Sequence, residues 1–320
     1  MSIDLGTPQY GYRVVENWAK LPEGLVVGDV SDIGIDGHDR VYLFNRGEHP
    51  VSVLEQDGTY ARCWGEGLFR RPHGLRVGPD GSLYCTDDAG HTVRKFTPEG
   101  KLLLQLGEPD KPSGYMEGKP FNRCTNTALS SNGEIYVSDG YGNARVHKFS
   151  PDGKLLLSWG EPGTRAGQFN VVHSICVDVD GWVYVADREN HRVQVFDRNG
   201  RFETQWNNLH RPCGMYMRGE RGALCYIAEA GTGLAINRQM PNIGPRVCVL
   251  TLEGKQLAQL GFRSPGQGLD QFVSVHGIAA DSQGDIYVGE TANHSWPSLF
   301  PGQPVPTGLR TFRKLAKVAI

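Results

Sequence analysis

The chain has 320 residues, of which 39% are hydrophobic and 21% are charged, and its formal net charge is −2. This composition supplies enough apolar residues for a large core and argues against a disordered chain. The small net charge and the lack of runs of Lys or Arg argue against a nucleic-acid-binding surface and against a protein of anionic membranes. No stretch has the pattern of a signal peptide or a membrane span, so we expect a cytoplasmic protein.

The chain has seven cysteines, an odd number, and no CxxC motif. Four of them lie in apolar, strand-like runs: Cys85, Cys176, Cys225 and Cys248. We therefore expect buried free thiols rather than disulfides, which fits a reducing compartment.

One pattern, a tyrosine within a short apolar run preceded by a turn, occurs six times along the chain. The spacing between successive tyrosines varies from 42 to 61 residues: Tyr42, Tyr84, Tyr136, Tyr184, Tyr226 and Tyr287. A constant core with variable spacing is typical of a repeated structural unit that carries loop insertions. Xaa-Gly pairs, such as Asp180–Gly181, supply the positive φ that tight turns between antiparallel strands require.

Each repeat predicts four short strands in chain order. In the second repeat these are Gly74–Val77, Ser82–Thr86, Thr92–Phe96 and Lys101–Leu106. Four antiparallel strands form one blade of a β-propeller. The chain is therefore predicted to be all-β, a single six-bladed β-propeller over residues 1–320.

The last repeat lacks an outer strand after Arg310–Leu315. The N-terminal segment Arg13–Trp18 (RVVENW) resembles the outer strand Lys154–Trp159 (KLLLSW). We expect this segment to complete the last blade and close the ring, because closure removes exposed sheet edges.

Three histidines share one position in the repeat, eleven residues before a repeat tyrosine. With small offsets in the first and fifth repeats, the six residues of this column are Asp32, His73, Thr125, His173, Cys213 and His276. Histidines in alternate blades of a six-bladed ring would converge on its axis from three sides. Three protein ligands and an open fourth position are typical of catalytic zinc, so a zinc site is predicted. The alternative is that these rings only bond to the backbone.

The loops after the tyrosine strands lie at the same end of the blades as the histidines. They carry Arg46, Tyr141 and Arg188. An arginine can bind a substrate carboxylate through its planar fork, and a tyrosine beside a dication can act as a general base. The alternatives are an ion pair of Arg188 with Glu189 or Asp187, and simple packing of Tyr141. Three long insertions at the same end would enclose a substrate: Glu108–Arg123, Ala230–Pro245 and Thr291–Thr307.

The repeats resemble NHL repeats, most clearly in residues 133–160 and 181–196. More specifically, the chain resembles the peptidyl-α-hydroxyglycine α-amidating lyases. The matching segments are FNRGEHP, PHGL, SDGYGNARVHKFSPDGK, VVHSI, ADRENHRVQ and VHGI. The resemblance implies a zinc ion bound by His73, His173 and His276, with Tyr141 as the base and Arg46 and Arg188 as its partners or those of the substrate. It also implies cleavage of a carbinolamine C–N bond.

The chain departs from that family at two positions. Gly277 follows the last histidine where the family commonly has an aspartate that helps to hold a structural calcium, so calcium is not carried over. Gly142 replaces a disulfide-bonded cysteine after the tyrosine. We expect a metal-dependent lyase that acts on a small or peptide-like hydroxylated amide. A metal-dependent lactonase or amidase, and a non-enzymatic NHL interaction module, remain as alternatives.

Overall fold

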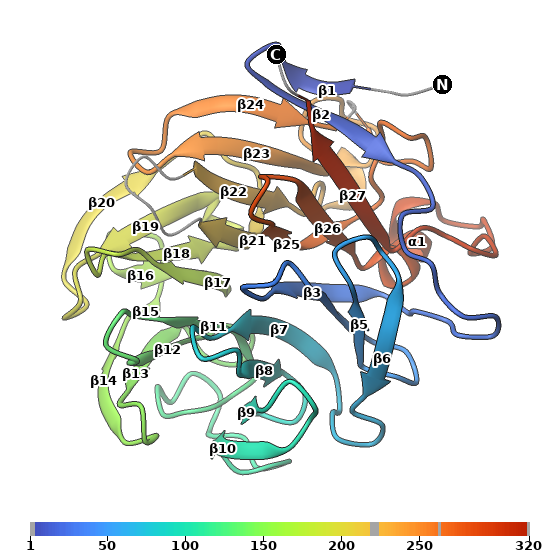
Figure 1. The fold of residues 1–320 in the computed structure, drawn as a ribbon. Coiled ribbons are helices and arrows are strands. Elements are labelled where there is room, and N and C mark those ends of the chain that lie inside the picture. The colour runs from blue at the N-terminus through green and yellow to red at the C-terminus, as the bar shows by residue number, and fades with distance from the viewer. Residues whose placement is uncertain (1–3, 218–223, 262–263, 319–320) are drawn as a thin grey trace. The chain divides into compact units, whose positions relative to one another are not determined.

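The computed structural model describes residues 4–217, 224–261 and 264–318, and nearly all of their regular structure is β-strand (Figure 1). Within these ranges the one α-helix is α1 (Ala292–Leu299), and two 3₁₀ turns span Arg188–Asn190 and Ala235–Asn237. The described chain forms two compact units of three blades each. One unit comprises residues 64–212, and the other comprises residues 4–63, 213–217 and 224–318.

Three four-stranded antiparallel blades make up the unit of residues 64–212. The second blade contains β7 (Pro72–Val77), β8 (Leu83–Asp87), β9 (Thr92–Phe96) and β10 (Leu102–Leu106). The third contains β11 (Cys124–Leu129), β12 (Ile135–Asp139), β13 (Arg145–Phe149) and β14 (Leu155–Trp159). The fourth contains β17 (Val172–Val177), β18 (Val183–Asp187), β19 (Arg192–Phe196) and β20 (Phe202–Trp206). A short parallel pair, β15 (Glu161–Pro162) and β16 (Gln168–Phe169), precedes the fourth blade.

The other unit contains the first, fifth and sixth blades. The first consists of β3 (Val30–Ile35), β4 (Val41–Asn45), β5 (Val51–Leu54) and β6 (Tyr60–Trp64). The fifth consists of β21 (Pro212–Met217), β22 (Leu224–Glu229), β23 (Arg246–Thr251) and β24 (Gln256–Leu260). The sixth consists of β25 (Val275–Ala280), β26 (Ile286–Glu290) and β27 (Phe312–Lys317), followed in the sheet by β2 (Tyr10–Val15) and β1 (Asp4–Thr7).

The predicted fold class, an all-β six-bladed β-propeller with four-stranded antiparallel blades, is confirmed by these six sheets of the described chain. The N-terminal segment completes the last blade as predicted, since β2 pairs with β27 and aligns Val14 with Leu315. The strand begins at Tyr10 rather than Arg13, and β1 adds a fifth strand that the sequence pattern did not predict. A single domain over residues 1–320 stays a prediction.

The seven cysteines are all free, as expected from their odd number and scattered placement. Six are buried, and Cys63 in β6 is partly exposed. Burial raises the pKa of the Cys85, Cys124 and Cys248 thiols above the usual range, so these side chains stay protonated and act as small apolar residues.

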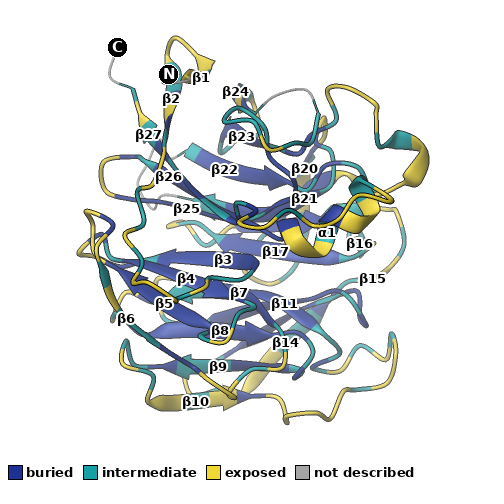
Figure 2. Ribbon diagram, turned by 90° about the vertical axis from the view of Figure 1, so that its right-hand side faces the viewer, coloured by how far each residue is buried: buried dark blue, intermediate teal, exposed yellow. Residues whose placement is uncertain are grey.

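The burial of the strands follows their order within a blade. The second strands are almost completely buried, whereas outer strands such as β10 are largely exposed (Figure 2). In the unit of residues 64–212, Tyr136, Trp159 and Phe196 belong to one apolar cluster, and the rings of Trp159 and Phe196 lie 5.9 Å apart.

A buried side chain that can accept hydrogen bonds ends the second strand of every blade. These residues are fully buried: Asn45, Asp87, Asp139, Asp187, Glu229 and Glu290. Asp87 accepts hydrogen bonds from the backbone N–H groups of Arg70 and Arg71 at 2.8 and 2.9 Å, just before β7. Asp187 accepts one from Asn170 N at 2.7 Å, just before β17. Each of these two carboxylates therefore holds the segment that leads into the innermost strand of its own blade.

The third strand supplies a partner for each buried carboxylate, an arginine in four blades and a histidine in the third blade. The pairs are Asp87–Arg94, Asp139–His147, Asp187–Arg192, Glu229–Arg246 and Glu290–Arg313. Arg192 Nε lies 2.8 Å from Asp187 Oδ2, and both side chains are at least nine-tenths buried. Such a pair is costly to break, because removal of one charge leaves the other buried without compensation.

We predict that Asp187→Asn lowers the free energy of unfolding by about 3 to 5 kcal/mol, because the Arg192 guanidinium stays buried without its carboxylate. Urea denaturation followed by tryptophan fluorescence measures this change. The matched control is Glu108→Gln, which breaks the exposed Lys111–Glu108 pair and should leave the denaturation midpoint unchanged. Equal midpoints for Asp187→Asn and the wild type would contradict the role given to the carboxylate.

Candidate functional site

The histidine column coincides with a β-bulge at the start of the inner strands. The pairing register shifts around His73, Thr125 and His173 in one unit, and around His276 in the other. A bulge adds one unpaired residue and redirects its side chain. The position eleven residues before the repeat tyrosine therefore corresponds to a β-bulge in these four blades.

In the first blade, the prediction of Asp32 as the column residue is wrong. The register shift there lies between Val30 and Asp32, so the bulged residue is Ser31. Asp32 follows it, and its Oδ1 accepts a hydrogen bond from Ile33 N at 2.9 Å. The small polar residues that alternate with the histidines are therefore Ser31, Thr125 and Cys213.

A chain of hydrogen bonds links successive column residues in the unit of residues 64–212. His73 Nδ1 lies 2.6 Å from the Thr125 carbonyl oxygen. The Thr125 hydroxyl in turn donates to the Val172 carbonyl at 3.0 Å, one residue before His173. Because a carbonyl oxygen only accepts, Nδ1 of His73 carries the proton and Nε2 presents its lone pair.

The same arrangement recurs in the other unit. His276 Nδ1 lies 2.7 Å from the Ser31 carbonyl oxygen, and the Cys213 thiol donates to the Val275 carbonyl at 3.0 Å. His276 therefore also has a protonated Nδ1 and an Nε2 lone pair. A backbone carbonyl that accepts the Nδ1 proton is a usual support of a metal-binding histidine.

The hydroxyl of Tyr141 lies between two of the histidines. It is 3.1 Å from His73 Nε2 and 2.9 Å from His173 Nε2, and the two histidine ring centroids are 4.8 Å apart. The hydroxyl has one proton and can donate to only one ring at a time. Two imidazole nitrogens and a phenol oxygen, each with a lone pair, therefore lie close together. These three atoms form a set of ligands that fits a zinc-like cation.

Gly140 allows Tyr141 to approach this point. A Cβ on Gly140 would lie 1.8 Å from the Val172 carbonyl oxygen, so a larger residue would push the loop away from β17. Gly142, on the other side of Tyr141, faces Asn122, whose Oδ1 would lie 2.0 Å from an added Cβ. The two glycines therefore fix the tyrosine against the inner strand.

Three guanidinium groups surround the ring of Tyr141. Those of Arg71, Arg123 and Arg188 lie 5.8, 4.7 and 5.6 Å from its centroid. Arg188 Nη1 also lies 3.5 Å from the Tyr141 hydroxyl, and Arg188 Nε donates to Glu189 at 2.7 Å. Arg188 therefore forms the ion pair considered from the sequence and also contacts the predicted base.

The arginines are grouped around two carboxylates. Asp88 is fully buried and bonds to both Arg71 and Arg123, with Arg71 Nε at 2.6 Å and Arg123 Nη2 at 3.0 Å. The bond to Asp88 is the main cause of the raised pKa of Arg71, and the phenol of Tyr141 contributes to it. Two guanidiniums and one carboxylate leave this cluster with one excess positive charge.

Glu189 forms the second cluster with Arg188 and Arg211, whose Nη2 lies 2.9 Å from Glu189 Oε1. Burial alone would raise the pKa of Glu189, but the hydrogen bond from Arg211 and the charges of both arginines lower it to about 2. This cluster also carries one excess positive charge. The surroundings of Tyr141 are therefore suited to an anion.

Reasoning from the sequence missed Arg71, Arg123, Arg211 and Asp88. A signal was present, because each of these arginines stands two residues before a column residue, namely His73, Thr125 and Cys213.

The structure brings together four of the six predicted site residues: His73, His173, Tyr141 and Arg188. His276 and Arg46 belong to the other unit. Arg46 follows β4 there, and its backbone N–H donates to the Asp29 carbonyl at 2.9 Å. The Asp29 carboxylate accepts from the backbone N–H groups of Asn293 and His294, in the first turn of α1, at 2.8 and 2.9 Å.

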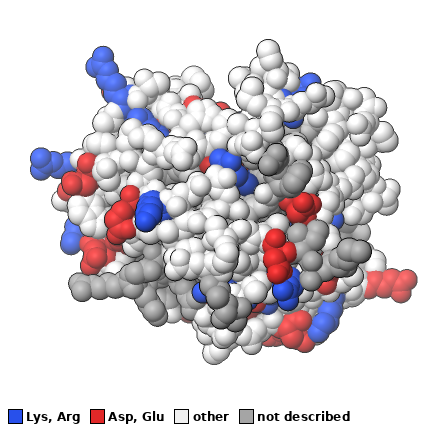
Figure 3. Space-filling model, turned by 90° about the horizontal axis from the view of Figure 1, so that it is seen from above, with Lys and Arg blue, Asp and Glu red and all other residues white. Residues whose placement is uncertain are grey.

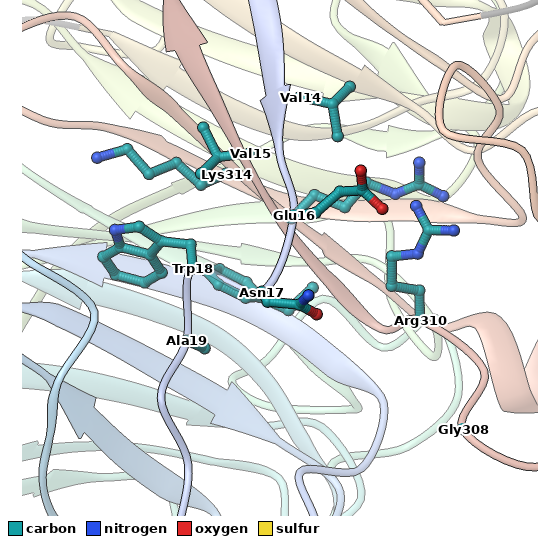
Figure 4. A pocket seen from close by; sticks show the side chains of 11 residues that line it. Val14, Val15, Glu16, Asn17, Trp18, Ala19, Gly308, Arg310 and Lys314 are labelled. Carbon is teal, nitrogen blue, oxygen red and sulfur yellow. The ribbon is translucent and has the colours of Figure 1, made fainter. Parts of the chain in front are cut away.

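That unit also contains a cavity of about 320 Å³ (Figure 4). Glu16, Trp18, Arg310 and Lys314 are among the residues that line it. Arg310 donates to the Gln267 carbonyl at 2.7 Å, and Lys314 lies 2.9 Å from Asp285. None of the predicted site residues lines this cavity.

On the face in Figure 3, acidic and basic side chains are interspersed among uncharged ones. No helix within the described ranges is long and apolar enough to cross a bilayer. The expectations of no nucleic-acid partner and no membrane partner stay predictions.

Comparison with known proteins supports the resemblance. The family profile of the NHL repeat matches residues 121–149 and 169–196. The chain is 34% identical over 269 residues to a peptidyl-alpha-hydroxyglycine alpha-amidating lyase 1 from Drosophila melanogaster, covering 76% of this chain and 47% of that protein. It is 33% identical over 313 residues to a peptidyl-glycine alpha-amidating monooxygenase B from Xenopus laevis, covering 85% of this chain and 34% of that protein.

The chain is an amidating-lyase-like NHL-repeat protein. A third relative, the NHL repeat-containing protein 3 of Homo sapiens, is 34% identical over 210 residues, which cover 62% of this chain and 60% of the relative. The chain thus spans between about a third and three-fifths of the length of these relatives.

Solved structures of similar fold include a streptogramin B lyase, with a TM-score of 0.59 and 13% identity over 92% of this chain and 96% of that one. A gluconolactonase from Xanthomonas campestris has a TM-score of 0.61 and 12% identity over 98% of this chain and 95% of that one. At such low identity, these two structures support the fold alone.

We predict that Glu189 stabilises the protein above pH 4.5 and loses this effect as the pH falls towards 2. Its pKa is lowered in the folded protein, so the charged form is favoured by folding, on the order of 2 to 3 kcal/mol. The difference in unfolding free energy between wild type and Glu189→Gln should therefore be largest near neutral pH and shrink below pH 4.5. Urea denaturation from pH 3 to 7 measures it, and a difference independent of pH would contradict the ion-pair cluster.

Proposed function

We propose that this protein is a metal-dependent lyase that cleaves a carbinolamine C–N bond in a small or peptide-like hydroxylated amide. The observation that carries the proposal is the position of the Tyr141 hydroxyl, 3.1 and 2.9 Å from Nε2 of His73 and His173 and 3.5 Å from Arg188. The name of the amidating lyase relative supports the same reaction class.

The proposed ligands of the metal are His73, His173 and His276. His276 is included because it occupies the corresponding bulge of its own blade. Its Nδ1 also bonds to a backbone carbonyl, as Nδ1 of His73 does. Zinc suits such a set of neutral imidazoles, and when bound it supplies a Lewis acid that polarises the substrate hydroxyl. A structural calcium is not proposed, because Gly277 offers no carboxylate.

Tyr141 is the proposed proton carrier. The substrate has the form R–CO–NH–CH(OH)–COO⁻, and its hydroxyl proton passes to the Tyr141 oxygen, which would enter this step in its deprotonated form. The O–H electron pair then forms the C=O bond, the C–N bond breaks, and the amide nitrogen receives a proton from Tyr141. The products are R–CO–NH₂ and an aldehyde that carries the carboxylate, so neither water nor a redox partner is consumed.

The arginines would hold the carboxylate of the substrate. Arg188 contacts the Tyr141 hydroxyl, so a carboxylate on its guanidinium would place the adjacent carbinol carbon beside that hydroxyl. The excess positive charge of the Arg71–Asp88–Arg123 cluster favours the same anion. Arg46 is proposed as a second partner from its place in the sequence pattern.

Two other functions have distinct signatures. A metal-dependent lactonase or amidase on the same residues would incorporate oxygen from ¹⁸O-labelled water into its carboxylic acid product, whereas the amide that the lyase releases would contain none. A non-enzymatic interaction module would agree with the NHL repeat-containing relative and would hold no metal. The cytoplasmic location and the peptide-like substrate are part of the proposal.

We predict that the purified protein contains about one zinc ion per chain and that His173→Ala loses most of it, because three ligands are reduced to two. Elemental mass spectrometry after dialysis measures the content. His38→Ala is the matched control, since this histidine is exposed and lies outside the column. Equal zinc in wild type and His173→Ala, or none in either after reconstitution, would contradict the metal site.

We predict that Tyr141→Phe lowers kcat by about 10² to 10⁴ while zinc is retained, because the proton carrier is lost and the ring remains. Formation of amide from an N-acyl-α-hydroxyglycine, followed by liquid chromatography, measures the rate. Tyr10→Phe, in the other unit, is the control and should behave as the wild type. An unchanged kcat in Tyr141→Phe would exclude the assigned role.

A further inference from the structure

A cavity of about 210 Å³ lies directly beside Tyr141, in the unit of residues 64–212. Its walls come from three segments: the insertion before β11, the loop that carries Tyr141, and the segment that leads into β17. The side chains that shape it include Met116, Tyr141, Ala144, Phe169 and Val171. Among the described residues that line it, none is charged.

The walls of the cavity are fixed by hydrogen bonds. Met116 N donates to the Gly142 carbonyl at 2.8 Å, which fastens the insertion to the Tyr141 loop. Gly163 N donates to the Phe169 carbonyl at 3.0 Å, and Asn190 Nδ2 donates to the Gly163 carbonyl at 2.8 Å. Ala144 and Phe169 are almost completely buried. The cavity is therefore formed before any ligand binds.

We propose that this cavity binds the apolar side chain of the residue on the acyl side of the scissile C–N bond. The inference rests on the proposed function and names its substrate class: N-acyl compounds with an aromatic or branched aliphatic group next to the reacting unit. Tyr141 joins the two places, since its hydroxyl contacts the histidines and its side chain forms a wall of the cavity.

The charges around Tyr141 set the direction in which the substrate lies. The guanidiniums of Arg71, Arg123 and Arg188 surround the ring and attract the carboxylate end. The uncharged cavity is left for the acyl end, because an anion placed there would be desolvated without a partner. The carboxylate and the apolar group of one substrate are thus separated at the tyrosine.

The volume indicates which groups fit. One water molecule occupies about 30 Å³, so 210 Å³ gives room for about seven heavy atoms. A benzyl group has that size, and a leucyl or valyl side chain is smaller. Tyr115 lies at the edge of the cavity with 77% of its surface exposed, so it can cover a group that has entered.

Binding of unreactive amide products tests the cavity separately from catalysis. The probes are N-acetyl-phenylalaninamide and N-acetyl-alaninamide, titrated into the purified holoprotein by calorimetry. We expect the aromatic amide to bind about tenfold more tightly, which corresponds to about 1.4 kcal/mol. Thr164→Trp, at the exposed edge of the cavity, should reduce the ratio to below about twofold and leave the affinity for the alanine amide unchanged.

Ala144→Val is the second variant and fills the cavity from its buried side. It covers the case in which the indole introduced by Thr164→Trp points away from the cavity. Val179→Trp is the matched control, because this residue is half-exposed and lies in the turn between β17 and β18. Circular dichroism verifies that all variants are folded. Equal affinity of the wild type for both amides, or a ratio unchanged in both filling variants, would overturn the proposal.

The same proteins separate this proposal from the proposed function. If the aromatic preference is present in binding but no N-acyl-α-hydroxyglycine is cleaved, the lyase function fails and the subsite stands. If cleavage occurs with equal kcat/KM and equal affinity for alanyl and phenylalanyl compounds, the function stands and the subsite fails.

Discussion

The structure depends on the buried hydrogen-bond acceptor at the end of each second strand. In the second, third and fourth blades, Asp87, Asp139 and Asp187 accept backbone N–H groups from the segment that enters the inner strand. That segment carries the column residue. Two positions before the column residue stands an arginine in the second and third blades and a valine in the fourth blade. The loop that follows the same carboxylate carries Asp88, Tyr141 or Arg188. In each of these three blades, one buried carboxylate thus fixes both of the polypeptide segments from which the candidate site is assembled.

The consequence for the site is that its residues act as positioned groups on rigid support. Tyr141 is held by a close approach of Gly140 to the Val172 carbonyl, and His73 by a hydrogen bond to the Thr125 carbonyl. The arginines are restrained by their shared carboxylates rather than by contact with a ligand. Such preorganisation is what a reaction with a developing charge requires, since little of the binding energy is then spent on ordering side chains.

Much of this could be predicted from the sequence, because the features involved repeat. The tyrosine strands, the glycine turns and the histidine register recur with the period of the blade, so each copy supports the others. The N-terminal strand was found because it resembles an outer strand. The strand β1, the bulge at Ser31 and the arginine clusters were missed. The positions of the guanidinium groups of Arg71 and Arg123 depend on tertiary ion pairs with the buried Asp88. No local sequence pattern specifies these pairs.

The hydrogen bonds behind the column histidines have one property that side-chain contacts lack. His73 and His276 are oriented by main-chain carbonyls of Thr125 and Ser31, and the carbonyl exists whatever side chain the residue carries. A serine, a threonine and a cysteine already occupy the three intervening positions of this chain. Support of this kind cannot be removed by a single substitution at the supporting residue. Substitutions at the intervening positions of the alternate blades therefore leave the orientation of the imidazoles unchanged. Substitutions in the surrounding loops can meanwhile alter which substrate is bound.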